Sequence, residues 1–171
     1  PDPIGAAGNF PEYYAAGANE KAGVGMYDDR FTFTLAGFQY DQITNGDVYI
    51  HNTLANDFPG SFDNGGDYTA PYPDQLGESW TLTTDPDTSI TVSNNSFIGY
   101  YSGVNTYRIL ELTDTSMYLQ YKHHEGGLLW YMRFIPEGFI PNSGGSGSTG
   151  YALPIDFEGS TQPQFTTFGG S

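Results

Sequence analysis

Aromatic rings are the side chains in this sequence whose type and placement best suit the binding of another molecule. The chain of 171 residues holds 14 Tyr, 12 Phe and 2 Trp. Some of these rings stand in Gly/Ala-rich or Pro/Gly-rich segments, where a core role explains them poorly. A ring exposed there can stack on the apolar face of a sugar, while a few polar side chains bind the hydroxyl groups. The candidate platforms are Tyr13, Tyr14, Tyr72 and Trp130, and the candidate polar contacts are Lys21, Arg108 and His123.

Carboxylates are the second chemical resource, and their placement weakens the case for catalysis. Enzymes that cleave glycosidic bonds use two carboxylates across the scissile bond, and strand positions i and i+2 share a face. Glu111 has no acid at position 109 or 113, and most of the 20 Asp and Glu residues cluster in turns. Acids in turns commonly cap Asx turns. We therefore expect a non-catalytic domain, with a glycoside hydrolase or lyase as the alternative.

Three acids in one Pro/Gly-rich segment are the candidate metal ligands. Asp57, Asp63 and Asp67 lie within eleven residues of one another in the sequence. Ca²⁺ takes hard oxygen ligands from loops of this kind, although the spacing does not match the EF-hand pattern. Calcium is the one cofactor that the sequence suggests.

The histidines and the missing motifs narrow the chemistry further. Adjacent residues in a strand point to opposite faces, so we do not expect His123 and His124 to share a zinc ion unless a bulge intervenes. The chain has no Cys, which excludes thiolate ligands and disulfides. It also lacks a Gly-x-Ser-x-Gly motif and any phosphate-binding glycine fingerprint.

Charge and hydropathy exclude further classes. Five basic and 20 acidic residues give a formal net charge of −15, which disfavours nucleic acid as a partner because phosphate contacts need Lys and Arg. No apolar run reaches the length of a transmembrane helix. The first residues, from Pro1, show no signal-peptide pattern, so we expect the chain to begin inside a longer or processed protein.

Short runs with period-2 alternation, separated by turn residues, predict an all-β fold. Its architecture is expected to be an antiparallel β-sandwich of the jelly-roll type, with an up-and-down, lipocalin-like barrel as the alternative. Phe31, Phe33, Trp80 and Phe134 are predicted core residues. Asn45-Gly46 predicts a hairpin, and residues 56–79 predict a long loop. The predicted strands are 31–35, 41–44, 47–52, 80–83, 89–92 (continuing over 97–101), 106–112, 116–122 and 128–136, the last three as a meander.

Composition also divides the chain into modules. Residues 1–141 are predicted to form a β-rich glycan-binding module. Residues 142–150 read NSGGSGSTG, which is typical of a flexible linker. Residues 151–171 are apolar again and are predicted to begin a following β module.

Five short stretches carry a resemblance to a known family. PEYYAAGANEK over 11–21 and MYDDRFTF over 26–33, followed by YRILEL over 107–112, MYL over 117–119 and WYMRFI over 130–135, resemble a β-rich domain of Bacteroidota polysaccharide-utilisation systems. Such domains occur in cell-surface glycan-binding proteins and in multimodular glycoside hydrolases, often beside Ig-like PKD repeats. The resemblance covers about residues 9–136. The chain departs from the family in having Tyr13-Tyr14 where Trp is typical, and in lacking a Trp-containing first strand.

The resemblance implies non-catalytic capture of a polysaccharide or oligosaccharide, outside the cell or on the outer-membrane surface. It implies neighbouring modules of the same chain and an outer-membrane glycan transporter or tethered enzyme as partners. Two further readings stay open beside the enzyme, namely a structural spacer and a lipocalin-like barrel that holds an apolar ligand. A deep apolar cavity would indicate the last of these.

Overall fold

The structure is a computed structural model that describes residues 14–17, 20–139 and 164–167. Within these ranges the chain has no helix with the length and apolar character needed to cross a bilayer. The short 3₁₀ helices are η1 (Ala36–Phe38) and η2 (Asn52–Asp57). The strands are β1 (Arg30–Thr34), β2 (Gln39–Ile43), β3 (Gly46–Ile50), β4 (Phe62–Asp63), β5 (Tyr68–Tyr72), β6 (Gln75–Thr83), β7 (Ser89–Val92), β8 (Thr106–Leu112), β9 (Met117–Lys122), β10 (Leu129–Pro136) and β11 (Gln164–Thr167).

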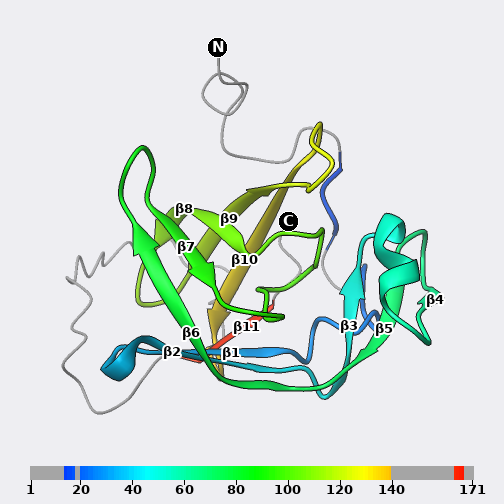
Figure 1. Cartoon of the computed structure of the whole chain (residues 1–171), viewed down its shortest axis with the longest axis horizontal. Coiled ribbons are helices and arrows are strands. Elements are labelled where there is room, and N and C mark those ends of the chain that lie inside the picture. Colours follow the sequence, from blue (N-terminus) through cyan, green and yellow to red (C-terminus); the bar gives the residue numbers. More distant parts are fainter. Residues whose placement is uncertain (1–13, 18–19, 140–163, 168–171) are drawn as a thin grey trace, which may run out of the picture.

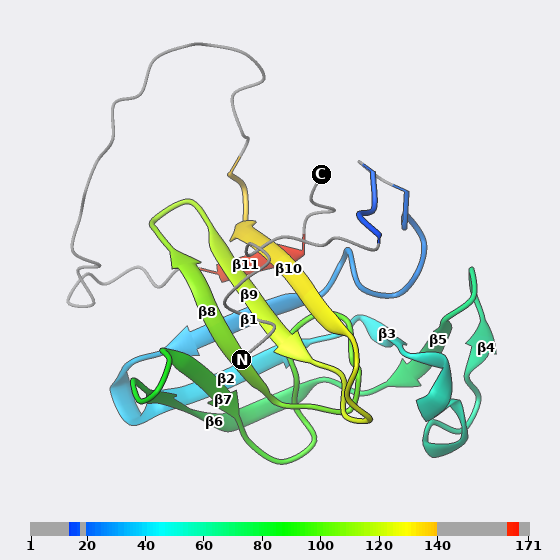
Figure 2. The same cartoon turned by 90° about the horizontal axis from the view of Figure 1, so that it is seen from above.

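Eight of these described strands close into a barrel, in the order β1-β11-β10-β9-β8-β7-β6-β2. All of the pairings are antiparallel, and each barrel strand lies beside its neighbour in the sequence once the inserted β3–β5 segment is set aside. The inserted strands form a separate sheet, β3-β5-β4, that stands beside the barrel (Figures 1 and 2). The predicted all-β class with antiparallel sheets is confirmed, and the strand order is that of the up-and-down barrel.

Period-2 alternation directs large side chains into the barrel. Phe31, Tyr40, Tyr107, Leu119 and Phe134 have no exposed surface, and the rings of Phe31 and Phe134 meet edge to face at 5.6 Å. Burying a side chain of this size contributes about 1.5–3 kcal/mol. The predicted core residues are confirmed, because Trp80 is also buried and Phe33 packs against the same cluster. Side chains therefore fill the middle of the barrel.

A buried segment, Ser96–Tyr101, connects the barrel to the three-stranded sheet; we call it the plug. Phe97 and Ile98 are 1% and 0% exposed. Barrel side chains satisfy the plug backbone: Tyr40 Oη donates to Phe97 O at 2.7 Å, and Phe97 N donates to Gln42 Oε1 at 3.0 Å. The plug also forms an isolated parallel bridge between Tyr101 and Ile50. The predicted continuation of the 89–92 strand over 97–101 is therefore wrong, because the backbone groups of Phe97 and Ile98 bond to side chains, whereas the isolated bridge is at Tyr101.

The Asn45-Gly46 turn joins two sheets instead of forming a hairpin. Asn45 and Gly46 have φ angles of 53° and 105°, the left-handed conformation that this dipeptide tolerates. The strands on either side do not pair, because β2 pairs with β1 and β6 while β3 pairs with β5. The predicted loop over 56–79 is also corrected, since it contains β4, β5 and the start of β6. The predicted meander of β8, β9 and β10 is confirmed.

The last described strand bears on the predicted module boundary. The sequence predicts that residues 151–171 begin a following module, but within this range β11 (Gln164–Thr167) pairs with both β1 and β10. These four residues therefore belong to the barrel, where they join the edges of two strands. The predicted linker over 142–150 and the rest of 151–171 lie outside the described residues.

Replacing Tyr107 by Phe should destabilise the fold through the plug. Tyr107 Oη accepts from Ile98 N at 2.9 Å and donates to Val104 O at 3.0 Å, so Tyr107→Phe leaves a buried N–H unpaired. We expect the free energy of unfolding, measured by urea denaturation, to fall by about 1–3 kcal/mol. Tyr118→Phe is the control, because no hydrogen bond within the described residues uses that hydroxyl. Equal stability of the two variants would contradict this role for Tyr107.

Candidate functional site

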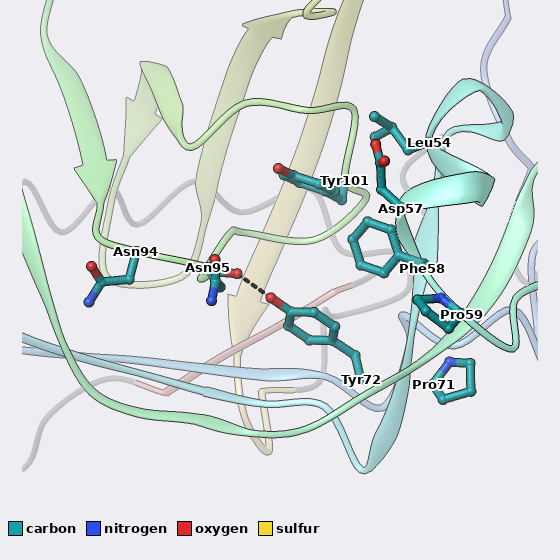
Figure 3. Close-up of a pocket in the computed structure, with 9 residues that line it drawn as sticks. All are labelled: Leu54, Asp57, Phe58, Pro59, Pro71, Tyr72, Asn94, Asn95 and Tyr101. Carbon is teal, nitrogen blue, oxygen red and sulfur yellow. Dashed lines mark hydrogen bonds between the residues drawn. The ribbon is translucent and has the colours of Figure 1, made fainter.

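An open pocket of about 400 Å³ lies between the three-stranded sheet and the barrel. Figure 3 shows its walls, with η2 and the residues after it on one side and the loop before the plug on the other. Tyr72 of β5 and Tyr101 of the plug lie between these walls. The lining residues are Leu54, Asp57, Phe58, Pro59, Pro71, Tyr72, Asn94, Asn95 and Tyr101. Three separate segments of the chain thus meet at one place.

Aromatic rings form the apolar part of this pocket. The ring centroid of Phe58 lies 5.6 Å from that of Tyr72 and 5.8 Å from that of Tyr101. Behind them, Phe97 of the plug stacks on Tyr101 at 4.4 Å with an interplanar angle of 26°. Offset and edge contacts of this kind hold rings in fixed orientations. Phe58, Tyr72 and Tyr101 are partly buried, so each keeps some surface for a ligand.

Polar groups stand around these rings. Tyr72 Oη donates to Asn95 O at 2.5 Å (Figure 3), and burial, with Tyr101 nearby, raises the pKa of the Tyr72 phenol to about 12. Asp57 and Asn95 are exposed, and no hydrogen bond within the described part of the chain uses the Asp57 carboxylate or the Asn95 side-chain amide. A carboxylate and an amide beside an aromatic surface can bind hydroxyl groups while a ring face contacts C–H groups.

A second feature, the aromatic row, runs from the β3 sheet toward β10. Lys21 Nζ lies 5.7 Å from the ring centroids of both Tyr14 and Tyr49. Tyr49 then contacts Tyr100 at 5.5 Å, and Tyr100 contacts Trp130 at 4.7 Å. The row ends at two histidines, because His51 lies 6.1 Å from Trp130 and 4.2 Å from His123. Its members are Tyr14, Lys21, Tyr49, Tyr100, Trp130, His51 and His123.

Buried polar atoms without partners mark the aromatic row. Tyr100 Oη, Trp130 Nε1 and both ring nitrogens of His123 are buried and make no hydrogen bond. Burial and the Asp67 carboxylate raise the pKa of the Tyr100 phenol well above its ordinary value. Tyr14, by contrast, donates to Glu20 Oε1 at 2.7 Å, and this hydrogen bond is the main cause that raises its pKa to about 12.

The structure divides the residues singled out from the sequence among several places. Tyr72 and Asp57 line the pocket, whereas Tyr14, Lys21, Trp130 and His123 belong to the aromatic row. Arg108 lies on β8, where it forms an ion pair with Asp87 at 3.0 Å, away from both features by its contacts. Tyr13 lies outside the described residues. Of the three predicted platforms that the structure describes, Tyr72 is thus separate from Tyr14 and Trp130.

The structure does not bring the candidate calcium ligands together either. Asp63 Oδ1 accepts from Gly66 N, and Asp67 Oδ1 accepts from Asn52 N. Asp57 lines the pocket instead. These three carboxylates are not among the described groups whose ligand atoms all lie within 4.8 Å of one another.

The histidines depart from expectation in a different way. His123 and His124 lie after the last residue of β9, in a turn, and their ring centroids are 4.5 Å apart. The expectation that they diverge was wrong, because it applied strand alternation to residues that are not in a strand.

Sequence reasoning missed Phe58, Tyr101 and the Asn94-Asn95 pair as pocket residues. Phe58 lies in the segment predicted as loop, and Tyr101 lies in the run predicted as strand. The neighbouring tyrosines Tyr100 and Tyr101 do carry a signal, since alternation predicts that their rings face opposite ways. The two rings do separate, with Tyr100 in the aromatic row and Tyr101 in the pocket.

Comparison with known protein families finds no family model that matches the chain, and the search of curated proteins likewise finds no match.

A buried acid sits near a smaller pocket formed by the Gly23–Asp28 segment and Asp47. Asp29 has no exposed surface, and neither of its carboxylate oxygens makes a hydrogen bond. Burial raises its pKa to about 9, and the carboxylates of Asp28 and Asp47 add to the shift while Arg30 opposes it. Asp29 is therefore protonated in the folded protein at neutral pH.

Asp29 should make stability depend on pH. Its pKa is about 9 when folded and near 3.8 ordinarily, so the stability conferred by keeping this carboxyl protonated is fully present below pH 4, falls as the pH rises and is lost once the pH has passed through 9. The loss approaches about 1.4 kcal/mol per pH unit between these values. We expect Asp29→Asn to remove this slope in denaturation curves from pH 5 to 9, whereas Asp114→Asn, in an exposed turn, keeps it. Parallel curves for Asp29→Asn and the unaltered protein would contradict the assignment.

Proposed function

We propose that this chain is a non-catalytic glycan-binding module whose ligand occupies the pocket of Figure 3. One observation carries the proposal: the rings of Phe58, Tyr72 and Tyr101 stand around an open pocket that also presents Asp57 and Asn95. A sugar offers both surfaces that such a site needs, because its ring has apolar C–H faces and a rim of hydroxyl groups. The resemblance of the sequence to Bacteroidota glycan-binding domains supports the same conclusion.

The pocket favours capture over cleavage. Asp57 is the one carboxylate among the residues that line it, whereas the usual mechanism of glycoside hydrolysis uses a pair of carboxyl groups across the bond. Asp57 serves in this proposal as an acceptor for sugar hydroxyls. A catalytic module would instead release reducing sugar from the glycan that it binds, which makes the alternative directly measurable.

Charge selects among glycans. The formal net charge is −15, and cations could attract an anionic glycan only if they converged on the pocket. Arg108 is paired with Asp87, and Arg133 is paired with Glu111. Lys21 lies between two rings of the aromatic row. We therefore propose a neutral polysaccharide or oligosaccharide as the ligand.

The proposed setting is the cell exterior or the outer-membrane surface. There the module would hold a glycan chain for an outer-membrane transporter or a tethered enzyme, together with neighbouring modules of the same chain. Binding at one shallow site is weak, and several sites on one polymer raise the overall affinity through effective concentration.

Affinity electrophoresis through gels that contain neutral polysaccharides tests the proposal. At least one polysaccharide should retard the protein, and Asp57→Ala should weaken that retardation about tenfold or more, because hydrogen bonds to a charged group contribute roughly 1.5–3 kcal/mol. Asn95→Ala should act in the same direction. Asp57 and Asn95 are exposed, so circular dichroism should show that both variants keep the fold.

Two controls make the outcome decisive. Asp114→Asn changes an exposed turn acid elsewhere and should leave retardation unchanged. Trp130→Phe alters the aromatic row and should also leave it unchanged. If no neutral glycan retards the protein, binding is refuted; if Trp130→Phe alone abolishes retardation, the pocket is the wrong site. Release of reducing sugar from a bound glycan would replace capture with catalysis.

A further inference from the structure

The three histidines of this chain, His51, His123 and His124, lie together in space although His51 is far from the other two in the sequence. The ring centroids of His51 and His123 are 4.2 Å apart, and those of His123 and His124 are 4.5 Å apart. Nothing in the proposed glycan pocket uses these side chains. Their convergence at the end of the aromatic row therefore needs its own explanation.

The turn between β9 and β10 builds this cluster. His123 N donates to Leu128 O at 3.0 Å, and Gly126 N donates back to His123 O at 2.8 Å. Gly126 and Gly127 have φ angles of 81° and 85°, which glycine adopts without strain. The turn is thereby tightened around residues 123–125. One ligand atom from each of His123, His124 and Glu125 lies within 4.8 Å of the other two, which among the described residues is the group placed to hold a metal ion.

His124 is fixed to the barrel as well as to its own turn. Its backbone N–H donates to Ser102 O at 3.1 Å, just beyond the plug. A Cβ at Gly103 would lie 2.6 Å from His124 Cγ, so the ring occupies space that only glycine leaves. Thr53 Oγ1 lies 3.4 Å from His124 Nε2 and 2.9 Å from His51 Nδ1. The cluster is therefore held from the barrel and from η2 as well as from the turn.

The buried ring nitrogens of His123, which have no hydrogen-bond partner, indicate that a ligand binds at this place. The His123 side chain is 4% exposed, and neither ring nitrogen makes a hydrogen bond. The Glu125 carboxylate lies close by, with Oε2 3.6 Å from His123 Nε2, and the Glu125 side chain is 60% exposed. Buried polar atoms in folded proteins nearly always have a partner, so an orphaned imidazole calls for a bound water or ion. An imidazole nitrogen and a carboxylate at this distance can both serve as ligands of one metal ion.

We propose that His123, His124 and Glu125 bind a divalent transition-metal ion of the zinc class. Two imidazoles and one carboxylate match the ligands that Zn²⁺ accepts in proteins, and three protein ligands leave a position open for water or for an oxygen of another molecule. Ca²⁺ and Mg²⁺ prefer oxygen-only ligand sets, so the ion belongs to the group that imidazole suits. His51 packs against the His123 ring and restricts its orientation.

Zinc binding to the tag-free full chain tests the proposal. Competition with a chromophoric chelator should show one equivalent of tightly bound Zn²⁺, and Co²⁺ should give visible absorption from a nitrogen-and-oxygen site. His124→Gln and Glu125→Gln should each weaken zinc binding about a hundredfold or more, since even changes outside the ligand shell cost 10–100-fold. Both positions are exposed, so the fold should survive. Glu137→Gln is the matched control, because Glu137 pairs with Arg30 at 2.9 Å instead.

A second measurement distinguishes zinc bound at the histidines from zinc bound nonspecifically by surface carboxylates. With three histidines in the chain, nitrogen-15 spectra of the rings resolve each one, and Zn²⁺ should shift the ring signals of His123 and His124 most. Absence of stoichiometric zinc binding overturns the proposal. So does equal affinity for Zn²⁺ in His124→Gln, Glu125→Gln and Glu137→Gln, because this would mean an adventitious ion only. Both zinc measurements are independent of whether the pocket binds a glycan.

Discussion

The buried plug sets the main constraint on this structure, because its backbone must find hydrogen-bond partners inside a barrel. Barrel side chains supply them: Tyr40 and Gln42 bond to Phe97, Tyr107 accepts from Ile98 N, and Tyr121 Oη donates to Tyr100 O at 2.7 Å. An unpaired backbone group buried there would cost about 1–3 kcal/mol. The same segment then leaves the barrel and bonds to β3, where Tyr101 N donates to Tyr49 O and His51 N donates to Tyr101 O. The plug thus fixes the three-stranded sheet against the barrel.

This constraint explains why the interior uses tyrosine where phenylalanine would pack equally well. Tyr40, Tyr107 and Tyr121 are each buried by their rings and bonded through their hydroxyls to plug or adjacent backbone. Burial raises the pKa of all three phenols, so each keeps its proton and can donate. A barrel filled in this way leaves its ligand-sized space at the surface, between the barrel and the inserted sheet, which is where the pocket lies.

The local sequence pattern predicted features that depend on a single strand, namely strand positions and core residues. It failed for features that depend on how distant strands and segments pair in space. Alternation located β1, β7 and the meander β8–β10, together with the core residues Phe31 and Phe134. Alternation could not show that β1 and β6 already pair with the two edges of β2. The Asn45-Gly46 turn therefore joins β2 to a strand of the other sheet, whereas the sequence predicted a hairpin. The pocket could not be predicted from local pattern either, because the residues that line it come from three separate segments, 54–59, 71–72 and 94–101. Tyr72 and Asp57 were found individually, without their shared surroundings.

The pocket and the histidine cluster both contact residues in or next to the plug. Tyr101 lines the pocket, Tyr100 belongs to the aromatic row, and the next carbonyl, that of Ser102, accepts from His124 N. A shift of this backbone would therefore move the Tyr101 ring and the histidine turn together. The exposed groups are different, since Asp57 and Glu125 stand on η2 and on the β9–β10 turn and neither supports the plug. The fold therefore places rigid aromatic surfaces on the plug and adjustable polar groups on the surrounding turns, and ligand chemistry can change at the turns without disturbing the barrel.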